Sequence, residues 1–145
     1  MKTICSLFLL TFLCIACSSD DNNMRNPNLL DINFQFLVDM SLPQYSSLQF
    51  PSNPVYVNGP NYGNRGVIII NTGSGSFRAF EASDPNHAPN ECSTLDINGI
   101  EGTCGCTDGN TYNLFTGQPL SEGLEYSLLE YRVTNNGNGT LTVSN

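Results

Sequence analysis

The run Val67-Ile68-Ile69-Ile70 constrains the fold more than any other stretch of this chain. It is too short for a helix, and its β-branched side chains favour an extended backbone. Because the run is continuous rather than alternating, it predicts a strand buried on both faces. A turn at residues 71–75 leads into Ser76–Glu81, where Phe77 and Ala79 alternate with Arg78 and Phe80. This second segment is the expected hairpin partner, so the pair should form the centre of a sheet.

Other short segments also have strand patterns. Residues 32–38 place Ile32, Phe34, Phe36 and Val38 on one face at a period of two. Asn98-Gly99 predicts a hairpin turn, because both positions tolerate a positive φ. Further strands are expected at residues 48–50, 55–57, 94–97, 111–115, 126–133 and 140–143, the last two joined through residues 135–139.

Prolines flank two of these candidates. Pro51 and Pro54 cannot donate a hydrogen bond to a ladder, so residues 48–50 and 55–57 belong at a sheet edge or a bend. Past the first residues, no window supports a helix of ten residues. The fold class predicted is therefore all-β, an antiparallel β-sandwich.

The N-terminus has the pattern of a processing signal. Lys2 supplies a positive charge, residues 7–13 are largely apolar, and Cys14-Ile15-Ala16-Cys17 is a small-residue cleavage site. The apolar run is shorter than the roughly 20 residues that a membrane-spanning helix needs. The junction resembles a bacterial lipobox, which implies a signal peptide over residues 1–16 and a lipid on Cys17. An ordinary secretory signal is the alternative.

Residues 17–28 are rich in Asn, Asp and Ser and lack apolar periodicity, so we expect a flexible tether. Ser18-Ser19-Asp20-Asp21 resembles the surface-export signal of lipoproteins from the Bacteroidetes group. The expected location is the outer membrane, with the protein lipid-anchored and exposed at the cell surface. The membrane is then a partner through the anchor.

The chain has 145 residues, of which residues 29–145 make one expected domain with its own core. Without Lys2 the chain carries 4 basic and 13 acidic residues, a net charge of −9. Nucleic acid is therefore not an expected partner, since binding the phosphate backbone requires basic surface.

The stretch from residue 77 to residue 119 holds the only histidine and every cysteine outside the N-terminus. It contains Asp84-Pro85-Asn86-His87, then Cys104-Gly105-Cys106-Thr107-Asp108-Gly109, then Tyr112-Asn113-Leu114-Phe115-Thr116-Gly117. This order resembles the Rieske iron–sulfur family, whose two loops read C-x-H and C-P-C-H-G-S-x-F-D-x-x-T-G. The resemblance runs from about Val67 to the C-terminus. It implies a small loop subdomain that carries the Cys/His segment.

Compared residue by residue, the resemblance implies a degenerate cluster site. Cys104 stands at a ligand position, Thr107 replaces a ligand His, Asp84 replaces a ligand Cys, and His87 falls one position late. Only one of the four ligands of a [2Fe–2S] centre remains, so no cofactor and no metal are expected. The alternative is an altered ligand set made of His87, Cys92, Cys104 and Cys106, which could hold a cluster or zinc.

Outside the cytosol, thiols that can meet are usually oxidised, so two of the three domain cysteines should be paired. The resemblance implies a disulfide between Cys92 and Cys106, because the family's bridge joins the two loops through the second Cys of C-P-C-H. A bridge from Cys92 to Cys104 is the alternative.

No catalytic constellation is present. His87 with Asp84 and a serine suggests a hydrolase, but no G-x-S-x-G elbow accompanies them, and one His in a loop rich in Pro and Asn is usually a surface residue. We therefore expect a non-enzymatic, membrane-anchored binding or structural module whose protein or small-molecule partner the residues do not name. An electron-transfer protein with a [2Fe–2S] cluster on altered ligands is the alternative, and a hydrolase or zinc enzyme built on His87 ranks last.

Overall fold

A computed structural model describes residues 26–145, which form strands joined by turns and two short 3₁₀ helices. The strands are β1 (Gln35–Asp39), β2 (Val55–Val57), β3 (Val67–Gly73), β4 (Ser76–Glu81), β5 (Leu95–Asn98), β6 (Glu101–Cys104), β7 (Thr111–Asn113), β8 (Glu130–Asn135) and β9 (Thr140–Ser144). The 3₁₀ helices are η1 (Ser46–Gln49) and η2 (Glu91–Ser93). The predicted signal peptide at 1–16 and the lipidation site at Cys17 lie outside the described residues.

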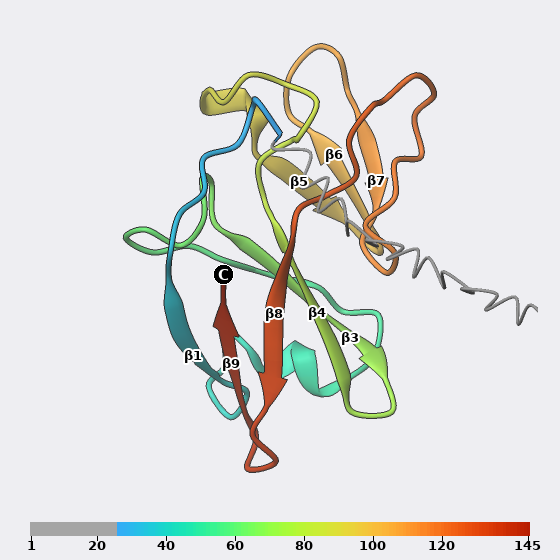
Figure 1. The fold of residues 1–145 in the computed structure, drawn as a ribbon. Coiled ribbons are helices and arrows are strands. Elements are labelled where there is room, and N and C mark those ends of the chain that lie inside the picture. Colours follow the sequence, from blue (N-terminus) through green and yellow to red (C-terminus); the bar gives the residue numbers. More distant parts are fainter. Residues whose placement is uncertain (1–25) are drawn as a thin grey trace, which may run out of the picture.

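The strands form two antiparallel sheets. One has six strands in the order β1-β9-β8-β4-β3-β2, and the other has three in the order β5-β6-β7. Figure 1 shows the small sheet above the long hairpin of β3 and β4. The all-β antiparallel class predicted from the sequence is confirmed, and the Cys/His segment lies in and around the small sheet.

The β3–β4 hairpin is buried on both faces, as its sequence predicted. Ile69 and Ala79 pack into a core formed with β1, β8 and β9, within the curve of the large sheet. Ile68 and Phe80 pack into a second core, which lies between this hairpin and the small sheet. The same two strands therefore support both halves of the domain.

Two predicted strands differ from the structure. Residues 48–50 do not form a strand: Leu48 and Gln49 belong to η1, and the backbone N–H groups of Leu48 and Phe50 donate to carbonyls three residues back. The buried Leu48 fixes this turn, and its carbonyl accepts from Asn71 at 2.8 Å. The other difference is at 126–133, where strand β8 begins at Glu130. Residues 126–129, which were predicted as the start of this strand, lie towards the small sheet instead, and Leu128 packs in the second core.

Buried Glu81 closes the loop before β3. Its carboxylate accepts from the backbone N–H groups of Asn64, Arg65 and Ser83, and from the Tyr131 hydroxyl at 2.6 Å. Burial and the neighbouring Glu81 raise the pKa of Tyr131 well above its ordinary value. The Glu81 side chain therefore has a structural role, since both of its carboxylate oxygens accept hydrogen bonds from other groups of the protein.

Residues 26–28, which the sequence assigned to the tether, contact the folded domain. The Asn26 and Asn28 side chains both donate to the Pro85 carbonyl, at 2.8 and 2.9 Å. The folded part of the chain thus includes three residues before Leu29. No helix of the described region has the length and apolar character needed to cross a membrane.

Candidate functional site

Two loops define the candidate site, one between β4 and β5 and the other between β6 and β7. The first is closed at its base by Asp84 N–H donating to the Ser93 carbonyl at 2.8 Å. The second is closed by Cys104 N–H donating to the Asn110 carbonyl at 2.7 Å. Gly105 N–H also donates to Thr94 O at 3.3 Å, so the loops lie against each other.

A disulfide joins the two loops. It links Cys92 and Cys106, with an S–S distance of 2.05 Å and Cα atoms 4.9 Å apart. This is the pairing that the family resemblance implied, and the alternative partner, Cys104, is free and buried. The Asn90 side chain accepts from the backbone N–H groups of Cys92 and Ser93, which caps η2 and holds Cys92 in place.

Asp84, which replaces a ligand cysteine in the resemblance, is fully buried and hydrogen-bonded. One carboxylate oxygen accepts from the Tyr112 hydroxyl at 2.5 Å and from Asn86 N–H at 2.8 Å. The other accepts from the Asn110 amide at 2.9 Å. Burial, with a smaller effect from Asp84, raises the pKa of Tyr112 far above its ordinary value, so Tyr112 remains a hydrogen-bond donor.

Asn86 stands where the resemblance places the first ligand histidine, and its side chain forms hydrogen bonds within the protein. Its amide nitrogen donates to Tyr112 Oη at 2.9 Å and to Tyr126 O at 2.7 Å. Its amide oxygen accepts from the N–H groups of Glu125 and Tyr126. Asn86 therefore attaches the segment before β8 to the first loop.

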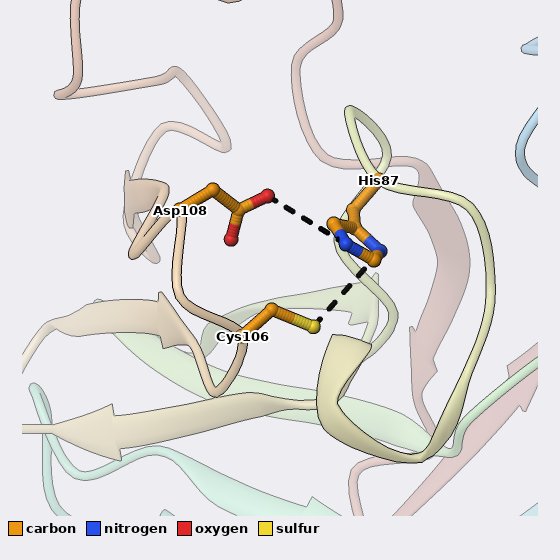
Figure 2. Close-up of side chains that lie close together, drawn as sticks. All are labelled: His87, Cys106 and Asp108. Atoms are coloured by element: carbon orange, nitrogen blue, oxygen red, sulfur yellow. Dashed lines mark hydrogen bonds and ion pairs between the residues drawn. The ribbon is translucent and has the colours of Figure 1, made fainter.

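His87 lies between the loops and is only partly exposed. Figure 2 shows its ring facing Cys106 on one side and Asp108 on the other. The ring Nδ1 is 2.7 Å from the Ala88 carbonyl, which can only accept, so Nδ1 is the donor in this contact. Nε2 then faces the Asp108 carboxylate at 3.9 Å. His87 is thus a partly exposed residue that also takes part in the contact between the loops.

Cys104 is the one retained ligand of the resemblance, and it lies in an apolar and acidic setting. Its side chain packs in the second core with an exposed fraction of 3%. Burial raises the pKa of the Cys104 thiol to about 12, and nearby Asp84 and Asp108 add to the effect. The ligand atoms of Asp84, Cys104 and Asp108 all lie within 4.8 Å of one another.

The [2Fe–2S] cluster that the resemblance implies does not fit these donors. The sulfurs of Cys92 and Cys106 are bonded to each other, so neither is a thiolate ligand. Thr107 is exposed, and the Asn86 side chain is fully engaged with Tyr112 and the 125–126 backbone. The predicted alternative set of His87, Cys92, Cys104 and Cys106 fails for the same reason, since it needs both bridged cysteines.

The structure brings together residues that sequence reasoning did not assign to the site. Asp108 follows the replaced ligand position Thr107 by one residue, as His87 follows Asn86 by one. Asn110 and Tyr112 donate to Asp84 from the strand edge. Spacing could have indicated Asp108, because in each loop a residue able to bind a metal stands one position after the place of the family's ligand histidine. Nothing in the sequence pattern singled out Asn110, which looked like a turn residue.

No family model matches the chain, and no curated protein matches it significantly. It is similar to a chain from the complex of reduced oxygenase and oxidized ferredoxin in carbazole 1,9a-dioxygenase, with 18% identity and a TM-score of 0.49 over 79% of this chain and 94% of that one. It is also similar to a structure described as an NADH-dependent nitrite reductase small subunit from Mycobacterium tuberculosis, with 19% identity and a TM-score of 0.46 over 79% of this chain and 97% of that one.

Proposed function

We propose that this protein is a membrane-anchored bacterial lipoprotein with a degenerate Rieske-like domain, which acts as a non-catalytic binding or structural module. The observation that supports it best is the hydrogen bonding of Asp84. A residue in a ligand position accepts from Tyr112, Asn110 and Asn86, so the chain's own side chains fill the role that a cluster would have in organising the loops.

The disulfide supports the same proposal. It links the two loops covalently and uses two of the three cysteines of the domain. A disulfide that closes a loop of this size stabilises a fold by about 3 kcal/mol, and it constrains the small subdomain without a metal.

The test is the iron content and visible spectrum of protein purified without oxygen. We expect colourless protein with no stoichiometric iron. Two irons per chain with the absorption of a Rieske-type centre would contradict the proposal and support the electron-transfer alternative.

Attachment to the membrane rests on the sequence pattern at Ala16-Cys17. A Cys17→Ser variant should leave the membrane fraction and should no longer incorporate labelled fatty acid, because the thioether-linked lipid is lost. Ser18→Ala, one residue further on, is the matched control and should stay with the membrane. A Cys17→Ser protein that remains acylated and membrane-bound would exclude the lipoprotein assignment.

A further inference from the structure

Three possible metal ligands from the two loops, Asp84, Cys104 and Asp108, converge beside the disulfide, and a fourth, His87, adjoins them through Asp108. The ligand atoms of Asp84, Cys104 and Asp108 lie within 4.8 Å of one another. His87 Nε2 lies 3.9 Å from the carboxylate of Asp108, which is therefore common to both contacts. None of these four residues takes part in the disulfide, so all four remain available in the oxidised protein.

The charge at this point is not balanced by the chain. Asp84 is fully buried, and a buried carboxylate is costly unless it is paired with a cation or well hydrogen-bonded. Within residues 26–145, the only ion pairs are Arg78 with Glu130 and the long contact of His87 with Asp108. The donors to Asp84 are all neutral, and one of them, the Asn110 amide, is shared between Asp84 at 2.9 Å and Asp108 at 3.4 Å.

We propose that Asp84, His87, Cys104 and Asp108 bind a single divalent ion of the zinc class. Zinc takes four ligands of the Cys, His and carboxylate type at about 2.0–2.3 Å, so two ligand atoms on one ion are at most about 4.6 Å apart. The ligand atoms of Asp84, Cys104 and Asp108 lie within 4.8 Å of one another and need only a small contraction, whereas the His87 ring must turn from the Asp108 carboxylate towards the ion. The arrangement suits one ion rather than two irons, because the first three ligands surround a single centre.

The surroundings of Asp84 are those of an oriented metal ligand. Ligating carboxylates are usually held by hydrogen bonds from outside the coordination sphere. Here Tyr112 and the Asn86 backbone N–H fix one oxygen, while the other accepts from Asn110. That second oxygen keeps a lone pair for an ion.

The ion site goes beyond the proposed function, and a test of one can fail without affecting the other. The proposed function concerns the absence of an iron cluster and the presence of an anchor, whereas this site concerns another ion on other ligands. The ion would join the two loops a second time, on the side of the second core.

The test is titration of the purified full-length protein with Zn²⁺ and with Co²⁺, without any reductant. We expect one ion per chain, a higher melting temperature with Zn²⁺, and a sulfur-to-cobalt charge-transfer band with Co²⁺. His87→Gln and Asp108→Asn should each weaken Zn²⁺ binding by about tenfold or more, since each removes one ligand. Cys104→Ser should abolish the charge-transfer band.

Glu91→Gln is the matched control, because Glu91 is an exposed acidic residue of the first loop outside the proposed set, and it should bind Zn²⁺ as the wild type does. His87 and Asp108 are partly exposed, so their variants should fold, which circular dichroism checks. No change in melting temperature with Zn²⁺, or equal affinity in the wild type and both variants, would overturn the proposal. Binding that appears only after reduction would also overturn it, since it would require Cys92 and Cys106.

Discussion

At the scale of single residues, the substitution of Asp84 for a ligand cysteine changes what holds the first loop. A thiolate needs a metal, whereas a carboxylate accepts hydrogen bonds from the protein itself. The three donors around Asp84 come from the first loop and from the segment that begins β7. Asp84 therefore links the first loop to the start of β7 through the protein's own hydrogen bonds.

Asp84→Ala should lower the free energy of unfolding by about 2–4 kcal/mol. The change leaves the Tyr112 hydroxyl and the Asn110 amide buried without their acceptor, and each unpaired buried group costs about 1–3 kcal/mol. Chemical denaturation measures the difference. Asp96→Ala, at an exposed position on β5, is the control and should stay within about 0.5 kcal/mol of the wild type.

Gly117 is required both by its backbone and by its neighbour. Its φ is +73°, and a Cβ at this position would lie 2.7 Å from the ring of buried Phe80. Gly117→Ala should therefore destabilise the fold by about 2–4 kcal/mol, from strain and overpacking together.

Gly137→Ala separates the two causes, because Gly137 has a similar φ of +77° with nothing within 4 Å of the added carbon. It should cost only about 1–2 kcal/mol. Equal melting temperatures for the two variants would show that the contact with Phe80 contributes nothing.

Sequence reasoning identified Asp84, His87 and Cys104 as special but could not say what surrounds them. Their positions follow from motif spacing, which is local. Their partners Asn110, Tyr112 and Asp108 depend on how the loops fold against each other, which brings together residues 26 and 28 positions apart in the sequence.

At the scale of elements, the two loops behave as one unit because of the link between Cys92 and Cys106. Cys92→Ser should lower the free energy of unfolding by about 2–5 kcal/mol, the usual effect of removing a native disulfide from a small secreted domain. Cys104→Ser should have a much smaller effect on the melting temperature.

Thiol titration gives an independent check of this pairing. The denatured, unreduced protein should show one free thiol among the three cysteines of the domain, and peptide mapping should assign it to Cys104. Three free thiols would contradict the disulfide, and a peptide that joins Cys92 to Cys104 would show that the loop register is different.

The strands were predictable where both faces are defined by the residues themselves. The run at 67–70 and the alternation at 76–81 gave β3 and β4 with the right faces. Residues 48–50 were not predictable in this way, because three residues carry no period and a single buried Leu48 is compatible with a turn or a strand. The start of β8 failed for another reason, since residues 126–129 are held by the first loop and by Gly117.

At the scale of the whole molecule, titration of buried groups sets an alkaline limit on stability. The pKa of Cys104 is raised from 9.0 to about 12 in the folded protein. The folded state thus keeps a proton that the unfolded state loses. The contribution of the Cys104 thiol to the free energy of unfolding is therefore complete below pH 9 and is lost as the pH rises towards 12.

The free energy of unfolding should fall by about 1 kcal/mol between pH values of about 9 and 10 because of this thiol. Cys104→Ser removes the titrating group, so its stability should change less over that interval, as measured by urea denaturation at each pH. Tyr112 and Tyr131, whose pKa values are also raised by burial, should extend the loss above pH 10 in both proteins. Parallel curves for the two proteins would show that Cys104 ionises as readily when folded as when unfolded.

The contacts of Asn26 and Asn28 with the Pro85 carbonyl determine how far the loops can stand from a membrane. Asn26 lies nine residues after Cys17, and a chain of that length spans at most about 30 Å when fully extended. If Cys17 carries the lipid, Pro85 cannot move further from the lipid headgroups than roughly the thickness of one hydrocarbon core. The end of the domain that bears the two loops would then be the end nearest the bilayer, and the β8–β9 turn would be free to face outward.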